Sequence, residues 1–200
     1  MDELIGFKFS YSTMKDKDSA NAKLLYSVAM GTHDKRAGIQ IIANFPIVTK
    51  WYELIAKHNN LDVFDPLVAK AYWIGNSLLD KSYDFSEINN FLEKKYSIRN
   101  GVPENSIPHH NLHVNNFGII SDSFASDKKV KSCVVKPVEY KDFTGLAISL
   151  IDNEKQIVSN PFDFEIKQGD IGAVHRNTLC ALLDEDALYN LRKYGFEKQQ

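Results

Sequence analysis

The sequence predicts an α+β protein, with a helical N-terminal domain followed by a small β-barrel and a C-terminal helix. Three observations predict this class. Apolar residues recur at helical spacing in the first half, short strand-like segments rich in β-branched and aromatic residues fill the second half, and an acidic cap precedes a last amphipathic segment. We place the helical domain at 1–100 and the barrel domain with its helix at 107–200.

Cap and stop residues divide the helical half. Ser19 is suited to cap a helix that Gly31 ends, because serine accepts from exposed backbone N–H groups and glycine tolerates the turn that follows a helix. Pro46 falls inside a continuous apolar pattern. We therefore expect two helices, over 35–44 and 46–58, since proline is tolerated best in a first helical turn.

Two further starts follow in this half. Asp65 before Pro66 is typical of a helix N-terminus, and apolar residues continue at helical spacing behind it. Ser86 begins a shorter helix. The segment 97–108 contains Asn-Gly and two prolines, and we interpret it as a connector.

The second half predicts strands that turn residues separate. A hairpin turn is expected at 152–155, Asp184 is the expected cap of the last helix, and Gly195 is its expected stop. Several short strands at close spacing favour a small barrel. The expected strands lie within HNLHVNNFGII, KSCVVKPVEY, FTGLAISLID, QIVSN, FDFEI and DIGAVH.

Composition and charge exclude several classes of function. The formal net charge is −2, so no overall field draws the chain to nucleic acid or to an anionic membrane. The N-terminus lacks the pattern of a secretory signal, and the apolar runs are far below the ~20 residues of a membrane helix. We expect a cytoplasmic protein with reduced thiols. Phosphate-binding loops, dinucleotide turns and serine-hydrolase elbows do not occur.

Histidines and cysteines concentrate in the second half. PHHNLHV holds His109, His110 and His113, of which the first and third share a face if the segment is a strand. Imidazole together with thiolate suits iron, zinc or another transition metal. The alternative is that these histidines are exposed or structural, because their spacing matches no zinc finger and no metalloprotease helix.

His175 is the sharper candidate for a metal ligand. It ends a strand that begins at a Gly-Asp turn, so its ring is expected at the barrel rim. A thiolate on a neighbouring strand would complete a two-point site, and Cys133 lies in such a strand. Cys180 is a further candidate ligand, although an apolar run follows it and free cysteine is often a small buried hydrophobe.

The segments CVVKPVEY (133–140) and QGDIGAVHRNTLCALLDEDA (168–187) resemble the HypC/HupF hydrogenase maturation chaperones over about residues 131–195. The resemblance implies a small OB-like barrel with a helix. It also implies a cysteine and a histidine that carry an Fe(CN)2CO unit and contact the immature large subunit of [NiFe] hydrogenase. Carried over by position, Cys133 takes the thiolate role and His175 the imidazole role, although Cys133 is internal whereas the family's cysteine follows the initiator methionine.

The whole chain also resembles an uncharacterised prokaryotic family. Its members combine a segment like AYWIGNSLLD (71–80) with a His-His-x-x-His-Val motif and a His-x4-Cys element. This resemblance implies no established activity. It favours joint action of His110, His113, His175 and Cys180.

Three functions remain open from the sequence. The first is a HypC-like accessory protein that holds or delivers iron to a hydrogenase large subunit or its maturation proteins, with the helical domain docking a partner or covering the site. The second is a metal-dependent enzyme built on His109, His110, His113 and His175, with Cys180 as an optional further ligand, whose reaction the sequence does not indicate. The third is a protein-interaction scaffold without a metal.

Overall fold

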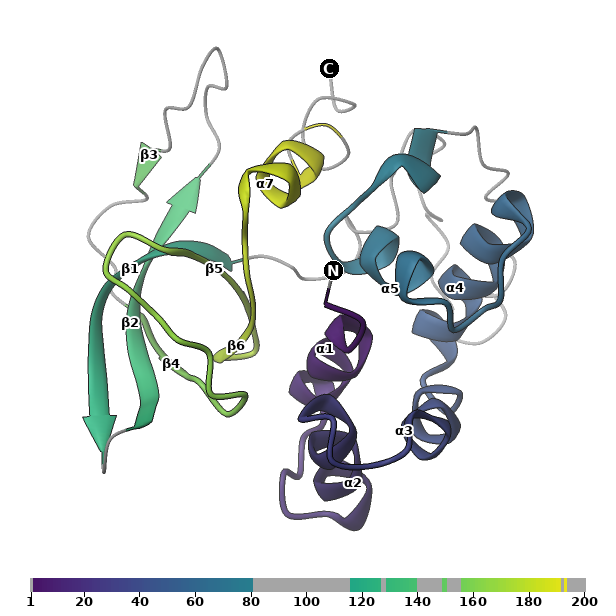
Figure 1. The fold of residues 1–200 in the computed structure, drawn as a ribbon, viewed down its shortest axis with the longest axis horizontal. Helices are drawn as coiled ribbons and strands as arrows, with labels where there is room; N and C mark the ends of the chain where they lie inside the picture. Colours follow the sequence, from purple (N-terminus) through teal and green to yellow (C-terminus); the bar gives the residue numbers. More distant parts are fainter. Residues whose placement is uncertain are drawn as a thin grey trace, which may run out of the picture.

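The computed structural model describes residues 2–80, 116–126, 129–139, 149–150, 156–191 and 193 of the 200-residue chain. Its class is α+β, as predicted: N-terminal helices, a small mixed sheet and a helix that follows the sheet. Figure 1 shows the N-terminal helices together on one side, the strands on the other, and α7 between them. The elements are α1 (Ile5–Thr13), α2 (Ala20–Ala29), α3 (Lys35–Ile42), α4 (Pro46–Asn59), α5 (Pro66–Trp73), η1 (Ser77–Asp80), β1 (Asn116–Ser126), β2 (Lys129–Glu139), β3 (Ser149–Leu150), β4 (Gln156–Ser159), β5 (Ile171–His175), β6 (Thr178–Leu182) and α7 (Glu185–Leu191).

The expected helix caps are present. The side chains of Ser19, Asp65 and Asp184 accept hydrogen bonds from backbone N–H groups in the first turns of α2, α5 and α7, at 3.3, 2.8 and 2.8 Å. Gly31 ends the α2 region with φ of +71°, a conformation that glycine adopts without strain. The prediction of two helices around Pro46 is also confirmed, because α3 ends at Ile42 and α4 begins at the proline.

The α5 helix is shorter than its apolar spacing suggests. It ends at Trp73, and Gly75 then turns the chain with φ of +96°. The Asn76 carboxamide stabilises this turn, since its Nδ2 donates to the Leu67 carbonyl at 2.8 Å and its Oδ1 accepts from the Leu78 N–H at 2.9 Å. The local hydrogen bonds of asparagine therefore compete with continuation of the helix.

Helix α1, which the sequence analysis did not single out, packs at the centre of the helical layer. Gly6 and Gly38 allow this close packing. A Cβ at Gly6 would lie 2.9 Å from the Cβ of Ala69 in α5, and a Cβ at Gly38 in α3 would lie 2.6 Å from the Phe7 ring. Because neither contact leaves room for a methyl group, these glycines permit the helices to approach closely.

The strands form one strongly curved mixed sheet. Antiparallel pairings join β1 to β2 and β5, β5 to β6, and β2 to β3 and β4. The parallel pairing of β4 with β6 rests on one registered pair, Ser159 with Thr178. The strands thus form a curved sheet with a short seam between β4 and β6, and the closed OB-like barrel that the resemblance implies stays a prediction.

Strand β6 is an element that the sequence analysis missed. It forms a two-residue hairpin with β5, in which His175 pairs with Thr178. Arg176 and Asn177 between them have φ of +46° and +59°. Positive φ at both positions suits the twist of such hairpins, but Arg-Asn is a weaker signal for this turn than Asn-Gly.

The expectation of a strand in FDFEI, residues 162–166, is wrong. Asp163 adopts φ of +54°, and Asn160 holds the segment as a loop through two hydrogen bonds with the Phe164 backbone, at 2.9 and 3.1 Å. The alternating aromatics contact the helices instead of forming a sheet face: Phe162 packs edge-on against Tyr11, with ring centroids 5.6 Å apart.

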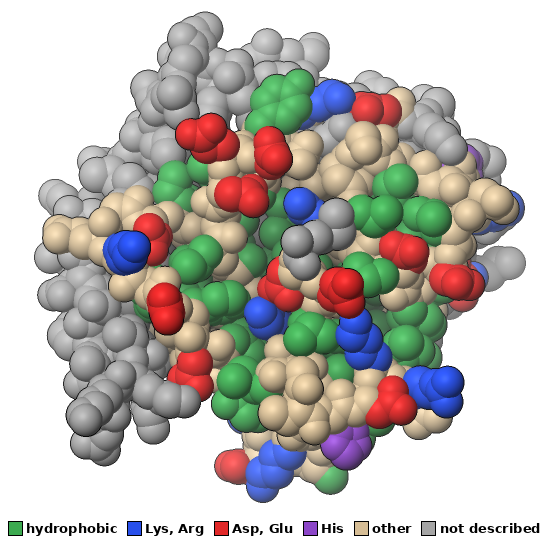
Figure 2. Space-filling view, viewed as in Figure 1, with side chains coloured by type: hydrophobic (Ala, Val, Ile, Leu, Met, Phe, Trp, Pro, Cys, Tyr) green, Lys and Arg blue, Asp and Glu red, His purple; other side chains and the backbone are tan. Residues whose placement is uncertain are grey.

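Among the residues whose burial is described, most of the buried apolar ones form one cluster that crosses from the helices to the sheet. It includes Ala173, Cys180 and Ala181 from β5 and β6 together with residues of α1 to α5. A small second cluster joins Val158, Val174 and Leu179. Figure 2 shows acidic and basic side chains interspersed on one face, in keeping with the small net charge.

Several predictions fall outside the described residues. These are the helix beginning at Ser86, the connector 97–108 that separates the two expected domains, the turn at 152–155 and the stop at Gly195. Among the residues that are described, no helix is long and apolar enough to cross a membrane.

Candidate functional site

His175 lies in the interior between α1 and the sheet, and its exposure is 4%. The prediction that its ring projects from the rim is therefore wrong. Successive strand residues alternate between faces. Val174 belongs to the small cluster on one face, so Ala173 and His175 point to the other face, which the helices cover. The end of β5 is not a rim of the sheet, because helix α1 packs on it.

The contact with Ser12 in α1 favours one tautomer of the neutral His175 ring. Its Oγ lies 2.5 Å from His175 Nδ1 and 2.5 Å from the carbonyl oxygen of Phe9. That carbonyl only accepts, so the single hydroxyl proton lies between Ser12 and Phe9. The proton between Ser12 and His175 must then belong to the ring. Neutral His175 is accordingly the Nδ1–H tautomer, with its lone pair on Nε2.

Two aromatic rings pack around this imidazole. Phe9 of α1 stacks on Trp73 of α5, with centroids 4.7 Å apart and planes 11° from parallel. Trp73 meets the His175 ring edge-on at 5.6 Å, and Phe9 lies at 6.4 Å. Aromatic and imidazole groups thus bind α1, α5 and β5 to one another, and the histidine is a part of the core.

Cys180 of β6 lies close to the histidine but is a protonated thiol. It is fully buried, and this burial raises the pKa of the thiol to about 12 against smaller opposing effects of nearby groups, of which Ser12 is the largest. Its Sγ lies 3.4 Å from the Thr178 carbonyl oxygen, which it contacts as a weak donor. At neutral pH this side chain behaves as a small hydrophobe in the absence of metal.

Two cations lie at the C-terminal end of α1, beside the buried histidine. Arg176 Nη1 donates to the Thr13 carbonyl at 2.6 Å, and Lys17 Nζ donates to the Tyr11 carbonyl at 2.5 Å. The last carbonyls of a helix lack intrahelical partners, so both bonds stabilise this end of α1. Partial burial lowers the pKa of Lys17 to about 8, with the Arg176 charge acting in the same direction.

Cys133 is described through the backbone pairing of β2. It pairs with Ser123 of β1 and with Val158 of β4, whereas His175 pairs with Thr178. The register therefore does not make Cys133 and His175 cross-strand neighbours. Its side chain lies outside the described part of the structure, so its thiolate role stays a prediction.

His109, His110 and His113 also lie outside the described residues, and their role as ligands stays a prediction. Within the described ranges, no group of three or more His, Cys, Asp or Glu side chains is placed to hold a metal ion. The pair that the structure does bring together is His175 and Cys180, both beside Ser12.

The sequence analysis missed Ser12, Trp73 and Lys17 as neighbours of the candidate site. Ser12 is 163 positions from His175, and no local pattern connects the two. Trp73 is 2% exposed and reaches the histidine from α5, another distant segment. No family model matches this chain, and neither the curated proteins nor the solved structures contain a significant match.

Proposed function

We propose that this protein is a HypC-like accessory protein that holds or delivers an Fe(CN)2CO-type unit for the large subunit of a [NiFe] hydrogenase. One observation carries the proposal: the order of elements after residue 168. A turn with Gly169 at φ of +95° leads into β5, His175 ends that strand, and an Asp184-capped helix follows. This is the order that the resembling segment has in the HypC/HupF family.

The protonation of His175 supports a role as a donor to this cargo. With the Nδ1 proton directed at Ser12, the basic nitrogen is Nε2. Ligating histidines commonly donate their other ring N–H to a neighbouring acceptor, which fixes the ring and raises the basicity of the donor nitrogen. Ser12 would accept this hydrogen bond from His175, and Cys133 would supply the thiolate.

In this proposal the helical layer acts as a cover. His175 is buried beneath α1, which the Ser12 contact and the Arg176 bond to Thr13 hold against the sheet. Cargo cannot reach the imidazole in this arrangement. In this proposal, loading would require the end of α1 to separate from β5.

The test is to express the protein anaerobically together with the hydrogenase maturation proteins. Freshly isolated protein should contain iron and show the infrared bands of bound CN and CO. Cys133→Ala and His175→Ala should lose both signals, while His33→Ala, which removes an exposed histidine outside the site, should keep them. Wild-type protein without iron and without these bands would rule out the carrier role.

A second candidate function, an interaction scaffold without metal, is favoured by the burial of both described candidate ligands. His175 and Cys180 are 4% and 0% exposed and contribute to internal packing. If this function holds, a folded Cys133→Ala, His175→Ala double variant should capture the hydrogenase large subunit as strongly as the wild type. Loss of capture in that folded variant would contradict it.

A further inference from the structure

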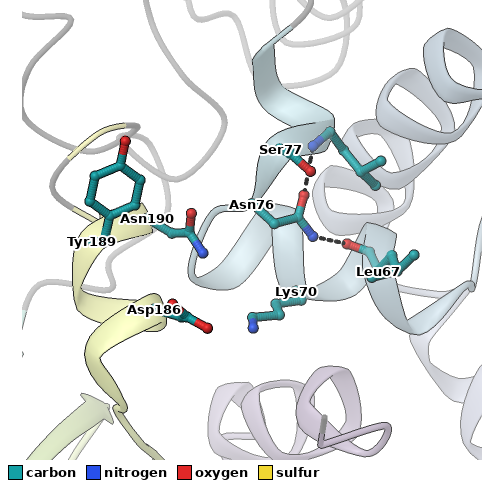
Figure 3. Close-up of a pocket in the computed structure, with 8 residues that line it drawn as sticks. Leu67, Lys70, Asn76, Ser77, Asp186, Tyr189 and Asn190 are labelled. Atoms are coloured by element: carbon teal, nitrogen blue, oxygen red, sulfur yellow. Dashed lines mark hydrogen bonds between the residues drawn. The ribbon is translucent and has the colours of Figure 1, made fainter.

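A cavity lies between the helical layer and the C-terminal helix α7, away from the His175 site. Its volume is about 350 Å³. Leu67 and Lys70 of α5 and Ser77 of η1 line one wall, and α7 lines the other with Asp186, Tyr189 and Asn190 (Figure 3). This volume falls in the range of small-molecule sites.

Opposite charges face each other across this space. Figure 3 shows the Lys70 ammonium and the Asp186 carboxylate directed into the cavity from its two walls. Within the described residues neither group belongs to an ion pair, although Lys193 and Asp80 pair at 2.7 Å between the same two parts of the fold. A cation and an anion held apart across a cavity match a ligand that carries both charges.

The other residues that line the cavity include an asparagine held in place by hydrogen bonds and several apolar residues. Asn76 is held on both ends of its carboxamide by the backbone, at 2.8 and 2.9 Å, so the α5–η1 wall is preorganised. Leu67 and Leu78 also line the cavity on this side, and Tyr189 on α7 is 61% exposed. An apolar substituent beside the two charges therefore has a surface to pack on.

We propose that this cavity binds a small zwitterion of the α-amino acid class with an aliphatic side chain. Its carboxylate would contact Lys70, its ammonium would contact Asp186, and its side chain would pack on Leu67, Leu78 and Tyr189. A simple anion would leave Asp186 unused, and a simple cation would leave Lys70 unused. The inference is independent of the proposed iron-carrier function, because none of its residues takes part in the His175 site.

The test is a titration of the full-length, 15N-labelled protein with L-leucine, followed by NMR. The side-chain amide signal of Asn190 and the backbone signals around Lys70 should shift and saturate, with a Kd on the order of 1 mM for so small a ligand. N-acetyl-L-leucine lacks the ammonium and L-leucinamide lacks the carboxylate. Each should bind about threefold more weakly, which corresponds to the loss of one solvent-accessible ionic contact.

Two variants assign the charges. Lys70→Met should weaken L-leucine binding about threefold and leave L-leucinamide binding unchanged. Asp186→Asn should likewise weaken L-leucine binding about threefold, and it should leave N-acetyl-L-leucine binding unchanged. Lys23→Met and Glu185→Gln, which remove charges outside the cavity, should bind L-leucine as the wild type does. The proposal is overturned if no saturable shift occurs, if N-acetyl-L-leucine binds as tightly as L-leucine, or if folded Lys70→Met keeps full affinity.

Discussion

Ser12 Oγ lies 2.5 Å from His175 Nδ1, which joins the first helix of the chain to a strand near its end. The pair is buried, and the Ser12 hydroxyl donates a hydrogen bond to the Phe9 carbonyl. The contact therefore both locks α1 on the sheet and sets the state of the imidazole. Two consequences can be measured separately.

The first consequence concerns stability. Ser12→Ala removes the acceptor of a buried ring N–H, and an unsatisfied buried donor costs about 1–3 kcal/mol. We expect the free energy of unfolding, measured with urea, to fall by that amount. Ser27→Ala is the matched control, since its hydroxyl donates to the Lys23 carbonyl in the preceding turn of α2 through a hydrogen bond at the exposed surface. Equal stability of Ser12→Ala and wild type would contradict the assigned hydrogen bond.

The second consequence is the tautomer of His175. Long-range 15N–1H correlation spectra at neutral pH should show the proton of this ring on Nδ1. In Ser12→Ala the preference should weaken, because the acceptor that selects Nδ1–H is gone. The exposed His33 serves as the internal reference in the same spectra. An Nε2–H signal for His175 in the wild type would contradict the proton assignment.

Cys180 should be unreactive in the folded protein. With a pKa of about 12, its thiolate fraction at pH 8 is about a thousandfold below that of an ordinary cysteine. In a Cys133→Ser background, alkylation by iodoacetamide should therefore be slower by at least that factor than in urea. Reaction at the rate of the unfolded chain would show that the thiol is accessible and ionised.

Two buried tyrosines of the helical layer should respond differently to loss of their hydroxyl. Tyr52 accepts a hydrogen bond from the Trp73 indole at 2.9 Å, so Tyr52→Phe leaves a buried N–H unsatisfied and should destabilise the fold by about 1–3 kcal/mol. The hydroxyl of Tyr72 has no hydrogen-bond partner in the described structure. Tyr72→Phe should be neutral or stabilising, and thermal unfolding of the two variants side by side tests the difference.

Lys17 should make stability increase with pH in a defined window. Its folded pKa is about 8, below that of the unfolded chain, so the unfolded state binds more protons above pH 8. The free energy of unfolding of the wild type should therefore rise relative to Lys17→Met between pH 8 and pH 10. Lys23→Met controls for loss of one positive charge. A relative fall over this window would contradict the lowered pKa.

Local chemistry allowed much of the fold to be predicted. Ser19, Pro46, Asp65 and Asp184 act through bonds within a few residues of themselves, and the helices they begin lie where expected. The segment FDFEI is not a strand, because its alternating aromatic residues pack against helices. The N-cap position of helix α1 is Leu4, which makes no side-chain cap hydrogen bond, and the sequence analysis did not find this helix.

The candidate site was predicted only in part, because the groups that surround His175 come from distant segments of the chain. The sequence placed His175 at the end of a strand, and this is correct. It did not indicate that helix α1 covers that strand end, where Ser12 lies 163 positions from His175. The ring was predicted at the rim, but it is buried and hydrogen-bonded. The side chains of the other candidates lie outside the described residues, so their roles as ligands stay predictions; they are Cys133, His109, His110 and His113.

The sequence by itself determined the class of the protein, the starts of its capped helices and the strand that leads to His175, because caps, prolines and apolar periodicity act over a few residues. Only the tertiary structure decided what surrounds that histidine. Packing of α1 on β5 and β6 is a contact between distant segments, and it sets burial, tautomer and thiol pKa together. Those properties arise from desolvation and from partners across the fold, which no local pattern encodes.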